Sequence, residues 1–334
     1  MPSKKRVFVI GGTGFLGYHT IREFLKNGWE ATALGLPPAP PVDPSATTSS
    51  QALYPATVKV ILRDIDAASD DELLALLRGH EALVFAAGMD DRTTPKKPAY
   101  PKFYHANVEI PVRVLKLAKR AGVKHAVIFG SYFAHFHRIW PEMRLAERHP
   151  YIRSRVEQER AVTSLPGMDV DVLELPYIFG TLPVPGWRPL WAPLINYLRA
   201  APLAFYMRGG TACIQAETVG KAAFGAIVRG HPSTFYPIGQ ENLTWPQMLT
   251  RLAVADGRQV RVVTLPDWML KIGLYAIWLI HELQGREGGL DPRHFAPLQT
   301  AQTYLDPDPS RQALGYKTGS LDDAFCETVK ASQE

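Results

Sequence analysis

The glycine-rich segment close to the start of the chain restricts the possible folds more than any other feature. Residues 7–10 are apolar and predict a buried strand, glycines follow at positions 11, 14 and 17, and residues 18–27 carry a helical pattern. A tight turn from strand to helix needs one glycine where the chain bends, a second where a pyrophosphate approaches and a third where helix and strand pack. Unpaired N–H groups at the helix N-terminus would then face the phosphates. The segment predicts a dinucleotide site, with a purely structural turn as the alternative.

Strand and helix patterns alternate through the first half of the chain. Apolar segments at 31–34, 58–62, 82–87 and 123–129 predict strands, and segments 70–77 and 107–121 predict helices. Segment 37–55 is rich in proline, serine and threonine, and segment 90–104 is polar. We expect both to be loops, the second over the active site. Such regular alternation predicts an α/β protein with a doubly wound parallel sheet, the Rossmann fold.

The composition excludes several classes of protein. The chain has 334 residues, a formal net charge of +5 and two cysteines, which rules out a disulfide framework and suits a cytoplasmic protein. No apolar core of a signal peptide precedes the first strand. The longest apolar run, 268–283, is interrupted by Lys271 and by His281 and Glu282, so we expect a surface-lying or lid helix and no membrane span. No basic, aromatic-rich stretch predicts nucleic-acid binding, and no residue cluster has the spacing of metal ligands.

Tyr151 and Arg155 form a second candidate site, at the start of a predicted helix that runs to about residue 163. Because they are four residues apart, both side chains lie on one helix face. A fixed cation beside a phenol favours the phenolate, so we expect a lowered pKa for Tyr151 and a role as general acid or base. Ser131, at the end of the neighbouring predicted strand, could hydrogen-bond the same substrate oxygen. The alternative is an ordinary surface helix with arginines on one face.

Two positions bear on the adenosine end of a bound dinucleotide. An acid at the end of the second strand selects NAD, and a base there selects NADP. This strand ends in Gly35 and Leu36, which carry no charge, so the sequence leaves both NAD and NADP open. Asp64 follows the third strand, and it either accepts a hydrogen bond from adenine or caps a turn.

Taken together, these motifs resemble the extended branch of the short-chain dehydrogenase/reductase superfamily, the NAD-dependent epimerase/dehydratase group. The resemblance begins with the glycine turn and the tyrosine motif. It continues in segments 63–65, 85–87, 107–108, 122–124, 175–180, 238–245 and 308–316, and it covers residues 7–325. It implies a dinucleotide-binding Rossmann domain at 1–180 and a mostly small substrate-binding domain at 181–334. Segments at about 211–240 would return to the Rossmann sheet.

The resemblance also implies which residues hold NAD or NADP. The pyrophosphate would lie against the glycine turn, the adenine beside the third strand and the carboxamide near 176–178. By position these residues are Gly11, Thr13, Gly14, Phe15, Leu16, Gly17, Asp64, Ile65, Ala86, Ala87, Gly88, Asn107, Tyr151, Arg155, Pro176, Tyr177 and Ile178. Tyr151 would transfer the proton, with Arg155 and Ser131 as the other catalytic residues. Because the helices at 107 and 151 usually form a dimer interface in the family, we expect a homodimer.

Two departures from the family pattern affect the predicted catalytic residues. The family's tyrosine motif ends in lysine, whereas this one ends in Arg155, which keeps the charge but cannot relay a proton. Ser131 stands alone where the family usually has two or three hydroxyl residues, and its spacing to Tyr151 is short. A shift of one residue would put Tyr132 in its place. Three histidines nearby are either loop residues or substitute acids: His135, His137 and His149.

The second half of the chain bears on the substrate. After Gly180 it is rich in aromatic residues, which suits an apolar or ring-bearing alcohol or ketone but also a small-domain core. Sugar-nucleotide members of the family carry a diphosphate-binding arginine in the segment that corresponds to 208–218. Here only Arg208 or Arg188, from a shifted position, could supply that charge. Trp268, Tyr275 and their apolar neighbours have helical spacing, which is more typical of a core or a subunit contact than of a pocket.

Three functions fit this pattern. The first is an NAD(P)-dependent oxidoreductase that interconverts a carbonyl and a secondary alcohol on a small molecule. The second is a nucleotide-sugar epimerase or dehydratase, which a diphosphate-binding cation would favour. The third is an NAD(P)-binding regulatory protein with little turnover, and Arg155 is its main support.

Overall fold

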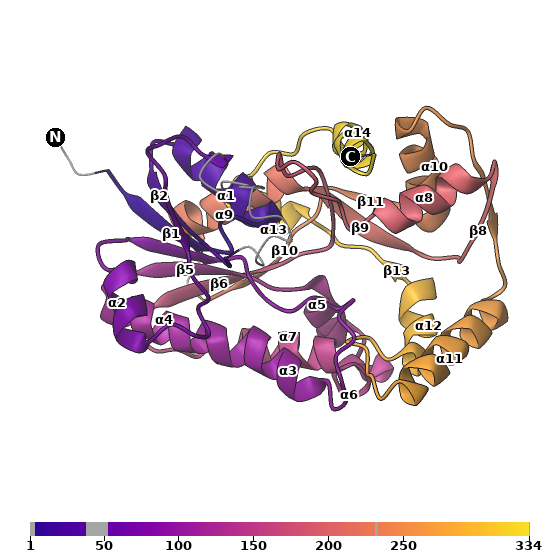
Figure 1. The fold of residues 1–334 in the computed structure, drawn as a ribbon, viewed down its shortest axis with the longest axis horizontal. Helices are drawn as coiled ribbons and strands as arrows, with labels where there is room; N and C mark the ends of the chain where they lie inside the picture. The colour runs from indigo at the N-terminus through magenta and orange to yellow at the C-terminus, as the bar shows by residue number, and fades with distance from the viewer. Residues whose placement is uncertain (1–3, 38–52, 231–232, 334) are drawn as a thin grey trace, which may run out of the picture.

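A seven-stranded parallel sheet forms the centre of the computed structural model, which describes residues 4–37, 53–230 and 233–333 (Figure 1). The strand order is β10-β6-β5-β4-β1-β2-β3, and every pairing is parallel. The strands are β1 (Arg6–Ile10), β2 (Glu30–Gly35), β3 (Lys59–Leu62), β4 (Ala82–Phe85), β5 (His125–Phe129), β6 (Asp169–Glu174) and β10 (Phe235–Pro237). The order reverses between β1 and β4, and ligands of doubly wound sheets bind at the carboxyl ends of strands beside such a reversal.

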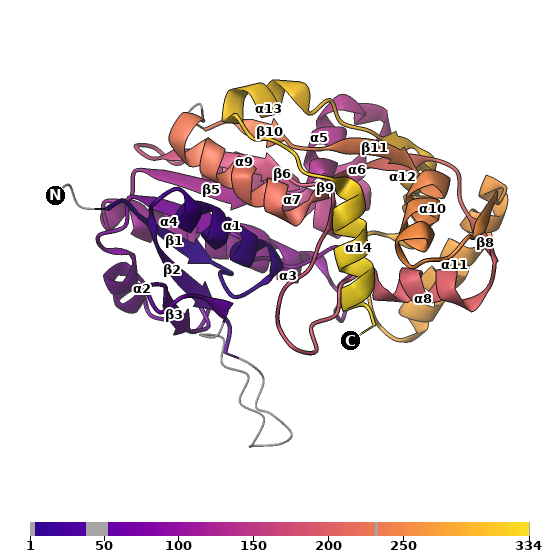
Figure 2. The ribbon, with the colours of Figure 1, turned by 90° about the horizontal axis from the view of Figure 1, so that it is seen from above.

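Helices cover both faces of this sheet, because its central strands are almost continuously apolar. One face is covered by α1 (Phe15–Lys26), α9 (Ala216–Arg229) and α13 (Asp308–Leu314) (Figure 2). The other is covered by α2 (Asp70–Leu77), α4 (Ile110–Arg120) and α7 (Pro150–Thr163). Phe24 packs into the first layer and Leu115 into the second. The predicted doubly wound Rossmann fold is confirmed.

Three helical segments differ from the sequence-based expectations. The loop predicted at 90–104 ends earlier, because α3 (Tyr100–Tyr104) forms and buries Phe103. The helix predicted at 107–121 starts as a π-helical turn, η2 (His105–Glu109), and continues as α4 from Ile110. His135 and His137 are not loop residues: they lie on α5 (Tyr132–Ile139), which begins directly after Ser131. Two short helices, η3 (Pro141–Met143) and α6 (Leu145–Arg148), lead from α5 to α7.

A second group of elements is built around β9 (Gly210–Gln215). This strand pairs with β7 (Tyr177–Phe179), β11 (Glu241–Thr244) and β13 (Gln302–Thr303). A separate parallel pair joins β8 (Leu203–Tyr206) and β12 (Arg261–Thr264). The helices of this group are α8 (Ala192–Ala200), α10 (Trp245–Ala255), α11 (Asp267–Leu283), α12 (Pro292–Thr300) and α14 (Leu321–Ala331).

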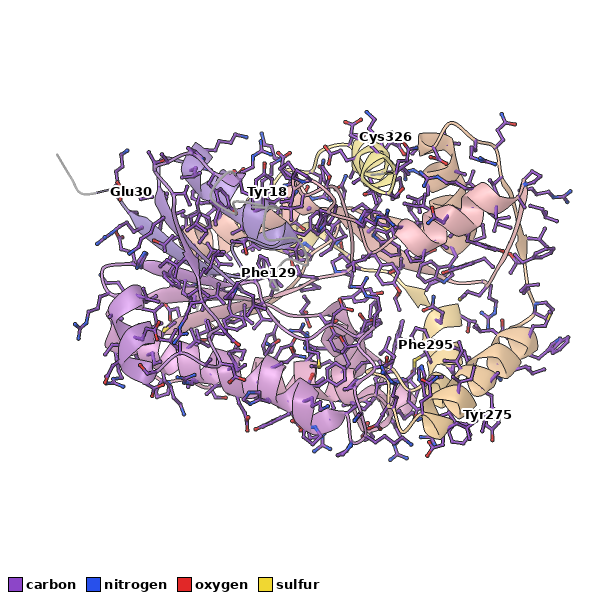
Figure 3. All side chains as sticks on the ribbon, viewed as in Figure 1. Tyr18, Glu30, Phe129, Tyr275, Phe295 and Cys326 are labelled. Carbon is purple, nitrogen blue, oxygen red and sulfur yellow. The ribbon has the colours of Figure 1, made fainter. Side chains whose placement is uncertain are left out.

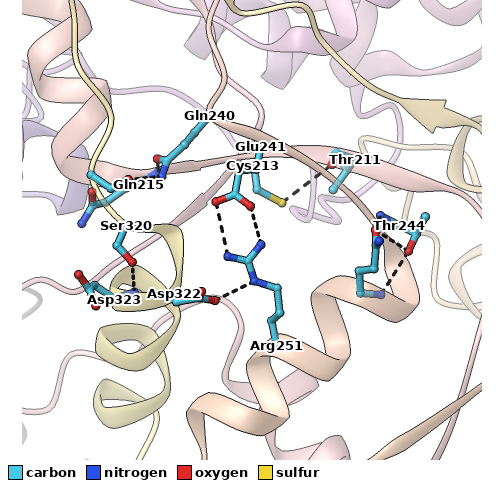
Figure 4. A network of polar contacts seen from close by, with 12 residues as sticks. Thr211, Cys213, Gln215, Gln240, Glu241, Thr244, Arg251, Ser320, Asp322 and Asp323 are labelled. Atoms are coloured by element: carbon cyan, nitrogen blue, oxygen red, sulfur yellow. Dashed lines mark hydrogen bonds and ion pairs between the residues drawn. The ribbon is translucent and has the colours of Figure 1, made fainter.

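The side chain of Arg251 links three elements of this group by hydrogen bonds (Figure 4). From α10 it donates to Glu241 on β11 at 2.6 Å and to Asp322 on α14 at 2.7 Å. Its guanidinium also lies over the ring of the buried Phe325, 5.2 Å from the ring centroid. A planar cation with several donors can hold two carboxylates at once, so the last helix is fixed to the strand and helix before it.

The chain returns from the second group to the central sheet. β10 follows β9 and α9 along the sequence, yet it pairs with β6 at the edge of the seven-stranded sheet. Within the segment at about 211–240, β10 therefore joins the central sheet and β9 belongs to the second group. The domain boundary at residue 180 stays a prediction, as does the loop at 37–55, most of which lies outside the described residues.

α11 lies at the margin of the molecule and packs on α12 (Figure 1). None of its residues is buried. Trp268 and Tyr275 are 61% and 57% exposed, so for these two the interpretation as core residues is wrong, whereas Trp278 is half-buried. Within the described part of the chain, no helix is both long and apolar enough to cross a membrane.

Candidate active site

The turn between β1 and α1 is built from glycines because backbone atoms crowd it from behind. Gly11 has a φ of +77°, which L side chains rarely adopt, and a Cβ there would lie 2.7 Å from the carbonyl oxygen of Ala86. A Cβ on Gly17 would lie 2.1 Å from the carbonyl oxygen of Gly11. Glycine at both positions therefore lets α1 and β4 approach the turn.

The front of the same turn is open. A Cβ on Gly14 would meet only the carbonyl oxygen of Gly11, at 3.2 Å. Gly14 is the N-cap of α1, and among the described residues no side chain caps this helix and no acid occupies its first turn. The first backbone N–H groups, including those of Phe15 and Leu16, therefore lack a side-chain acceptor, and the helix dipole favours a negative charge beside them. The turn fits the pyrophosphate that the family resemblance implies.

Thr13 packs against the end of β2. A Cβ on Gly35 would lie 1.9 Å from the Thr13 hydroxyl, so glycine is needed there for packing. The ring of Phe15 lies 5.2 Å from that of Trp187, which belongs to the loop before α8. The predicted pyrophosphate residues are thus all brought together in one turn.

Small residues end β4 and leave its backbone accessible. Ala86 and Ala87 are half-buried, and Gly88 is exposed. Asn107 holds the next residue: its Oδ1 accepts from the backbone N–H of Met89 at 2.8 Å, and its Nδ2 donates to the carbonyl oxygen of Met89 at 3.2 Å. The same Nδ2 donates to Ser154 on α7 at 3.1 Å. Asn107 therefore fixes the loop after β4 against α7, which makes it a positioning residue.

Tyr151 and Arg155 lie on the buried side of α7, so the surface-helix alternative is wrong. The Arg155 guanidinium lies 5.2 Å from the centroid of the Tyr151 ring. Its Nη1 donates to the carbonyl oxygen of Phe129 at 3.2 Å and to Oε1 of Gln158 at 3.0 Å. Arg155 is 7% exposed, and its Nε has no hydrogen-bond partner among the described residues. Its Nη2 lies beside Gly88, since a Cβ there would be 3.2 Å from this atom, so the guanidinium is next to the strand end where a ribose is expected.

The pKa of Tyr151 is raised above its ordinary value, so the expectation of a lowered pKa is wrong for the chain as it stands. Burial is the largest cause. Arg155 and the hydroxyl of Ser131 lower the pKa of Tyr151, whereas Asp91 raises it. The cation acts in the expected direction, but desolvation of the phenolate outweighs it.

The sequence did not decide whether Ser131 or Tyr132 supplies the hydroxyl beside Tyr151, and the structure gives the two side chains different surroundings. Ser131 is the N-cap of α5, where its Oγ accepts from the backbone N–H of Phe133 at 3.3 Å, and its hydroxyl faces Tyr151. The hydroxyl of Tyr132 lies 2.9 Å from Oγ1 of Thr211 on β9. Tyr132 is 2% exposed and is used in packing. Ser131 is therefore the candidate hydroxyl beside Tyr151.

Asp64 and Ile65 lie directly after β3. Oδ1 of Asp64 accepts from the backbone N–H of Asp66 at 2.9 Å, which is the turn-capping role. The carbonyl oxygen of Ile65 accepts from Arg113 at 3.1 Å. Both Asp64 and Ile65 are half-buried, so a ligand can still reach them.

Aromatic rings surround the segment that is expected to hold a carboxamide. Pro176 joins β6 to β7, and Tyr177 and Ile178 open β7. The Tyr177 ring lies 5.1 Å from the Trp191 ring, and Nε1 of Trp191 donates to the carbonyl oxygen of Ile178 at 2.8 Å. Trp245 lies on another side of Tyr177, with the ring centroids 5.5 Å apart.

Asp91 is a candidate residue that the sequence analysis did not single out. Burial and the neighbouring Asp90 raise the pKa of Asp91 to about 7, and Asp91 in turn raises the pKa of Tyr151. Asp90 is itself held by Arg92, whose Nε donates to it at 2.6 Å. A carboxylic acid that titrates near neutral pH beside a buried phenol is a candidate for proton transfer. The sequence feature that could have identified Asp91 is a pair of acids just after a predicted strand that ends in small residues.

The chain returns to this site after α11. The backbone N–H of Tyr151 donates to the carbonyl oxygen of Gly289 at 2.9 Å, and that of Gly289 donates to Thr93 at 3.3 Å. A Cβ on Gly289 would lie 2.7 Å from the Phe103 ring and 3.0 Å from Cβ of Tyr151. The segment after α11 therefore packs directly on Tyr151 and on the loop after β4.

Burial favours the neutral form of the three histidines of this region. His149 is fully buried, its Nδ1 accepts from the backbone N–H of Asp291 at 3.0 Å, and burial lowers its pKa to about 4. Burial also lowers the pKa values of His135 and His137. The positive charge of Arg138 also lowers the pKa values of His135 and His137.

Both arginines considered for a diphosphate lie outside β9 in the sequence. Arg208 pairs with Asp267 at 2.7 Å, at the start of α11. Arg188 is exposed in the loop before α8. The buried strand β9 carries no charged side chain. Among the described residues, no three His, Cys, Asp or Glu side chains are grouped as they would be around a metal ion.

An open glycine turn at the reversal of a parallel sheet, a buried tyrosine with a cation one turn later and a strand-end serine define an extended short-chain dehydrogenase/reductase. The profile of the NAD dependent epimerase/dehydratase family matches residues 7–182, and the chain belongs to this family. A protein from Synechocystis sp. that carries the name "Putative dihydroflavonol 4-reductase" is 22% identical over 343 residues, which cover 96% of this chain and 93% of that protein.

Several solved structures share the fold. The structure of gox2253 has a TM-score of 0.75 and 18% identity, with 99% of this chain and 98% of that chain covered. A dTDP-glucose 4,6-dehydratase from Streptomyces venezuelae, with NAD bound, has a TM-score of 0.66 and 18% identity, with 98% and 97% covered. A UDP-glucose 4-epimerase from Thermotoga maritima, with UDP-glucose, has a TM-score of 0.66 and 14% identity, with 98% of each chain covered.

Proposed function

We propose that this chain is an NAD(P)-dependent oxidoreductase that interconverts a carbonyl and a secondary alcohol. The observation that carries the proposal is the placement of Tyr151, Ser131 and Arg155 together, beside an accessible strand end and an open glycine turn. The shared fold of an NAD-bound dehydratase supports a dinucleotide at that turn. When bound, the dinucleotide supplies or takes up the hydride at the substrate carbon. Gly35 and Leu36 leave the choice between NAD and NADP open.

Tyr151 handles the proton in this proposal. Its raised pKa keeps the phenol protonated at neutral pH, which is the form that donates to a carbonyl oxygen as the carbon is reduced. Ser131 donates a hydrogen bond to the same oxygen. Arg155 binds the ribose and stabilises the phenolate but stays protonated, so it cannot return the proton. We assign that step to Asp91, the carboxylic acid with the largest influence on Tyr151.

An apolar or ring-bearing substrate fits the surroundings of Tyr177 best. The rings of Trp191 and Trp245 pack on this residue, and the neighbouring strand β9 is uncharged. The name of the Synechocystis relative, a dihydroflavonol 4-reductase, supports a ring-bearing ketone.

A nucleotide-sugar epimerase or dehydratase is the second candidate. The solved structures that share the fold include a UDP-glucose 4-epimerase with UDP-glucose and a dTDP-glucose 4,6-dehydratase with NAD bound. Arg208 is paired with Asp267, whereas Arg188 is exposed and forms no ion pair among the described residues, so of these two arginines Arg188 is the one available to a diphosphate. Arg188→Ala separates the two candidates, because only turnover of a nucleotide-sugar should depend on this charge.

Calorimetric titration with NAD⁺, NADH, NADP⁺ and NADPH tests the proposal. We expect tight binding of one pair, followed by turnover of ring-bearing ketones with that cofactor and loss of at least about a hundredfold in kcat for Tyr151→Phe. Binding of none of the four would reject both enzymatic functions. Tight binding without turnover of ketones or nucleotide-sugars would favour the third function, an NAD(P)-binding regulatory protein.

A further inference from the structure

α11 carries a large share of the exposed apolar side chains of the described chain. Large apolar residues that are exposed elsewhere are spread over several elements, with no more than two on any one of them among the described residues. On α11 they are Trp268, Met269, Ile272, Tyr275, Ile277, Leu279, Ile280 and Leu283. A concentration of this kind marks a surface that contacts a partner or a membrane.

Most of these side chains form one stripe along the helix. Leu270, Leu274 and Trp278 recur at every fourth residue, are half-buried and face the protein. The opposite side presents Ile272 and Leu279 to solvent, and among their neighbours three and four residues away only Glu282 is charged. Figure 3 shows Tyr275 at the outer margin of the molecule, away from the interior where Phe295 of α12 lies. The stripe is therefore a free surface of the described chain.

The two acids of α11 are neutralised by partners. Asp267 at its start pairs with Arg208 at 2.7 Å. Glu282 at its end forms an ion pair with Lys97, which belongs to the loop after β4. Neither acid therefore leaves an uncompensated negative charge beside the stripe.

Cations without ion pairs remain at both ends of the stripe. Lys271 forms no ion pair among the described residues, and with Arg208 it lines a hollow of about 370 Å³ between α11 and α12. Beyond the C-terminal end, the backbones of Lys96 and Arg286 bridge, and neither side chain has an ion pair in the described chain. An apolar helix stripe with tryptophan and tyrosine and with basic residues at its margins has the composition of a helix that lies in a membrane interface.

A second copy of the chain fits this surface less well. A helix of 17 residues is about 25 Å long, and its stripe alone covers much less than the roughly 800 Å² per partner of a stable interface. Pairing the same surface on two copies would also bring the basic margins together, which Coulomb repulsion opposes.

We propose that α11 binds to the surface of a membrane that contains anionic phospholipids, with Ile272 and Leu279 in the acyl boundary and Lys271 at the phosphates. Membrane binding goes beyond the proposed function and does not depend on it. Its consequence for catalysis does rest on the proposed function. Because Gly289, just after α11, contacts Tyr151, the bound helix brings the active site close to apolar substrates that partition into the bilayer.

Sedimentation with vesicles, using the full chain without cofactor, tests this proposal. We expect binding to vesicles of equimolar phosphatidylcholine and phosphatidylglycerol to be at least about tenfold tighter than to phosphatidylcholine alone. Ile272→Glu with Leu279→Glu should weaken binding to the anionic vesicles at least about tenfold. The matched control is Val228→Glu with Val254→Glu, because these residues are exposed apolar positions on α9 and α10, and it should leave binding unchanged. Lys271→Glu should weaken binding to anionic vesicles only.

Three results would overturn the proposal. The first is no binding of the native chain to the anionic vesicles. The second is an equal loss in the control variant, since binding would then not depend on α11. The third is a dimer that the Ile272 and Leu279 substitutions dissociate, without vesicle binding, which would assign the stripe to a second copy. The dinucleotide titration is made in solution without lipid, so a failure here leaves the proposed function standing.

Discussion

Arg155 is the residue at which this site departs most from the pattern of its family. Its Nη1 donates to both the Phe129 carbonyl and Gln158, and its Nη2 lies beside Gly88, where a Cβ would be 3.2 Å from Nη2. A lysine in its place has a compact head group without this planar arrangement of donors. Because the Arg155 guanidinium has two acceptors in this arrangement, we predict that arginine is the adapted residue at this position.

We predict that Arg155→Lys lowers kcat about tenfold and that Arg155→Met lowers it about a hundredfold, because the first loses the hydrogen-bond geometry and the second also loses the charge. Steady-state kinetics with the preferred cofactor measures both. The matched control is Arg153→Lys, since Arg153 is exposed on the same helix, where it forms an ion pair with Glu157 and lies over the Tyr100 ring, away from Tyr151. A rise in kcat for Arg155→Lys would show that the native chain is a poor catalyst.

Asp91 makes stability depend on pH in a direction that is unusual for a carboxylate. Because burial raises its pKa to about 7, the folded chain retains a proton that the unfolded chain loses near pH 4. Stability from this group is full below the unfolded pKa and is lost as the pH rises through about 7. We predict that Asp91→Asn is more stable than the native chain by roughly 1–3 kcal/mol at about pH 8, and that the difference vanishes near pH 4.

Urea unfolding of both proteins across this pH range measures the effect. Asp169→Asn is the control, because Asp169 is exposed at the start of β6 and its side chain has no hydrogen bond or ion pair in the described chain. An equal change for the two variants at every pH would contradict the assignment to Asp91.

Sequence patterns identified the residues that lie on regular elements better than those on irregular ones. Tyr151 and Arg155 were found from helical spacing alone, and the structure places both on the buried face of α7. Asp91 was missed because it lies in a loop, where no period relates a residue to its neighbours in space. The choice between Ser131 and Tyr132 depended on where α5 begins, which spacing alone does not determine.

At the scale of elements, different glycines of the turn between β1 and α1 serve packing and ligand binding. Gly17 is crowded by the Gly11 carbonyl, whereas Gly14 is open at the front. We predict that Gly14→Ala weakens dinucleotide binding at least about tenfold but changes the free energy of unfolding without cofactor by less than about 1 kcal/mol. We expect Gly17→Ala to destabilise the chain by about 1–3 kcal/mol, because its Cβ has no room.

Calorimetry and thermal unfolding measure these two effects. Gly273→Ala is the control, since a Cβ there meets no atom within 4 Å on the exposed α11, and it should leave dinucleotide binding unchanged. Normal dinucleotide binding by Gly14→Ala would mean that the pyrophosphate does not lie at this turn.

The strands were easier to predict than the short helices. The strands of the central sheet in the first half are runs of apolar residues bounded by turns, and all were predicted near their observed positions. α3, η2 and α5 are each eight residues or fewer, which is about two turns, so no clear period develops in their sequences. Their positions depend on tertiary packing, for example of Phe103 and Phe136, which are fully buried.

At the scale of the whole molecule, the family resemblance leads us to predict a homodimer through α4 and α7, and the structure shows what such an interface would be made of. Within the described chain, none of the large exposed apolar residues lies on α3, α4 or α7. The exposed residues of α4 and α7 are instead mostly basic: Lys116, Lys119, Arg120, Arg153 and Arg160. A two-fold interface would bring these charges together, so dimerisation should be opposed by repulsion that salt screens.

We therefore predict a dimer of the 37.1-kDa chain that is weak at about 0.05 M salt and stronger at about 0.5 M. Light scattering at micromolar concentration measures the mass in both conditions. Lys116→Glu should strengthen the dimer at low salt, because it replaces a repulsive contact between the two copies with an attractive one. Lys330→Glu, an exposed change of the same charge on α14, should not. A monomer at both salt concentrations would refute the dimer, and a dimer that weakens as salt is added would place the interface on another surface.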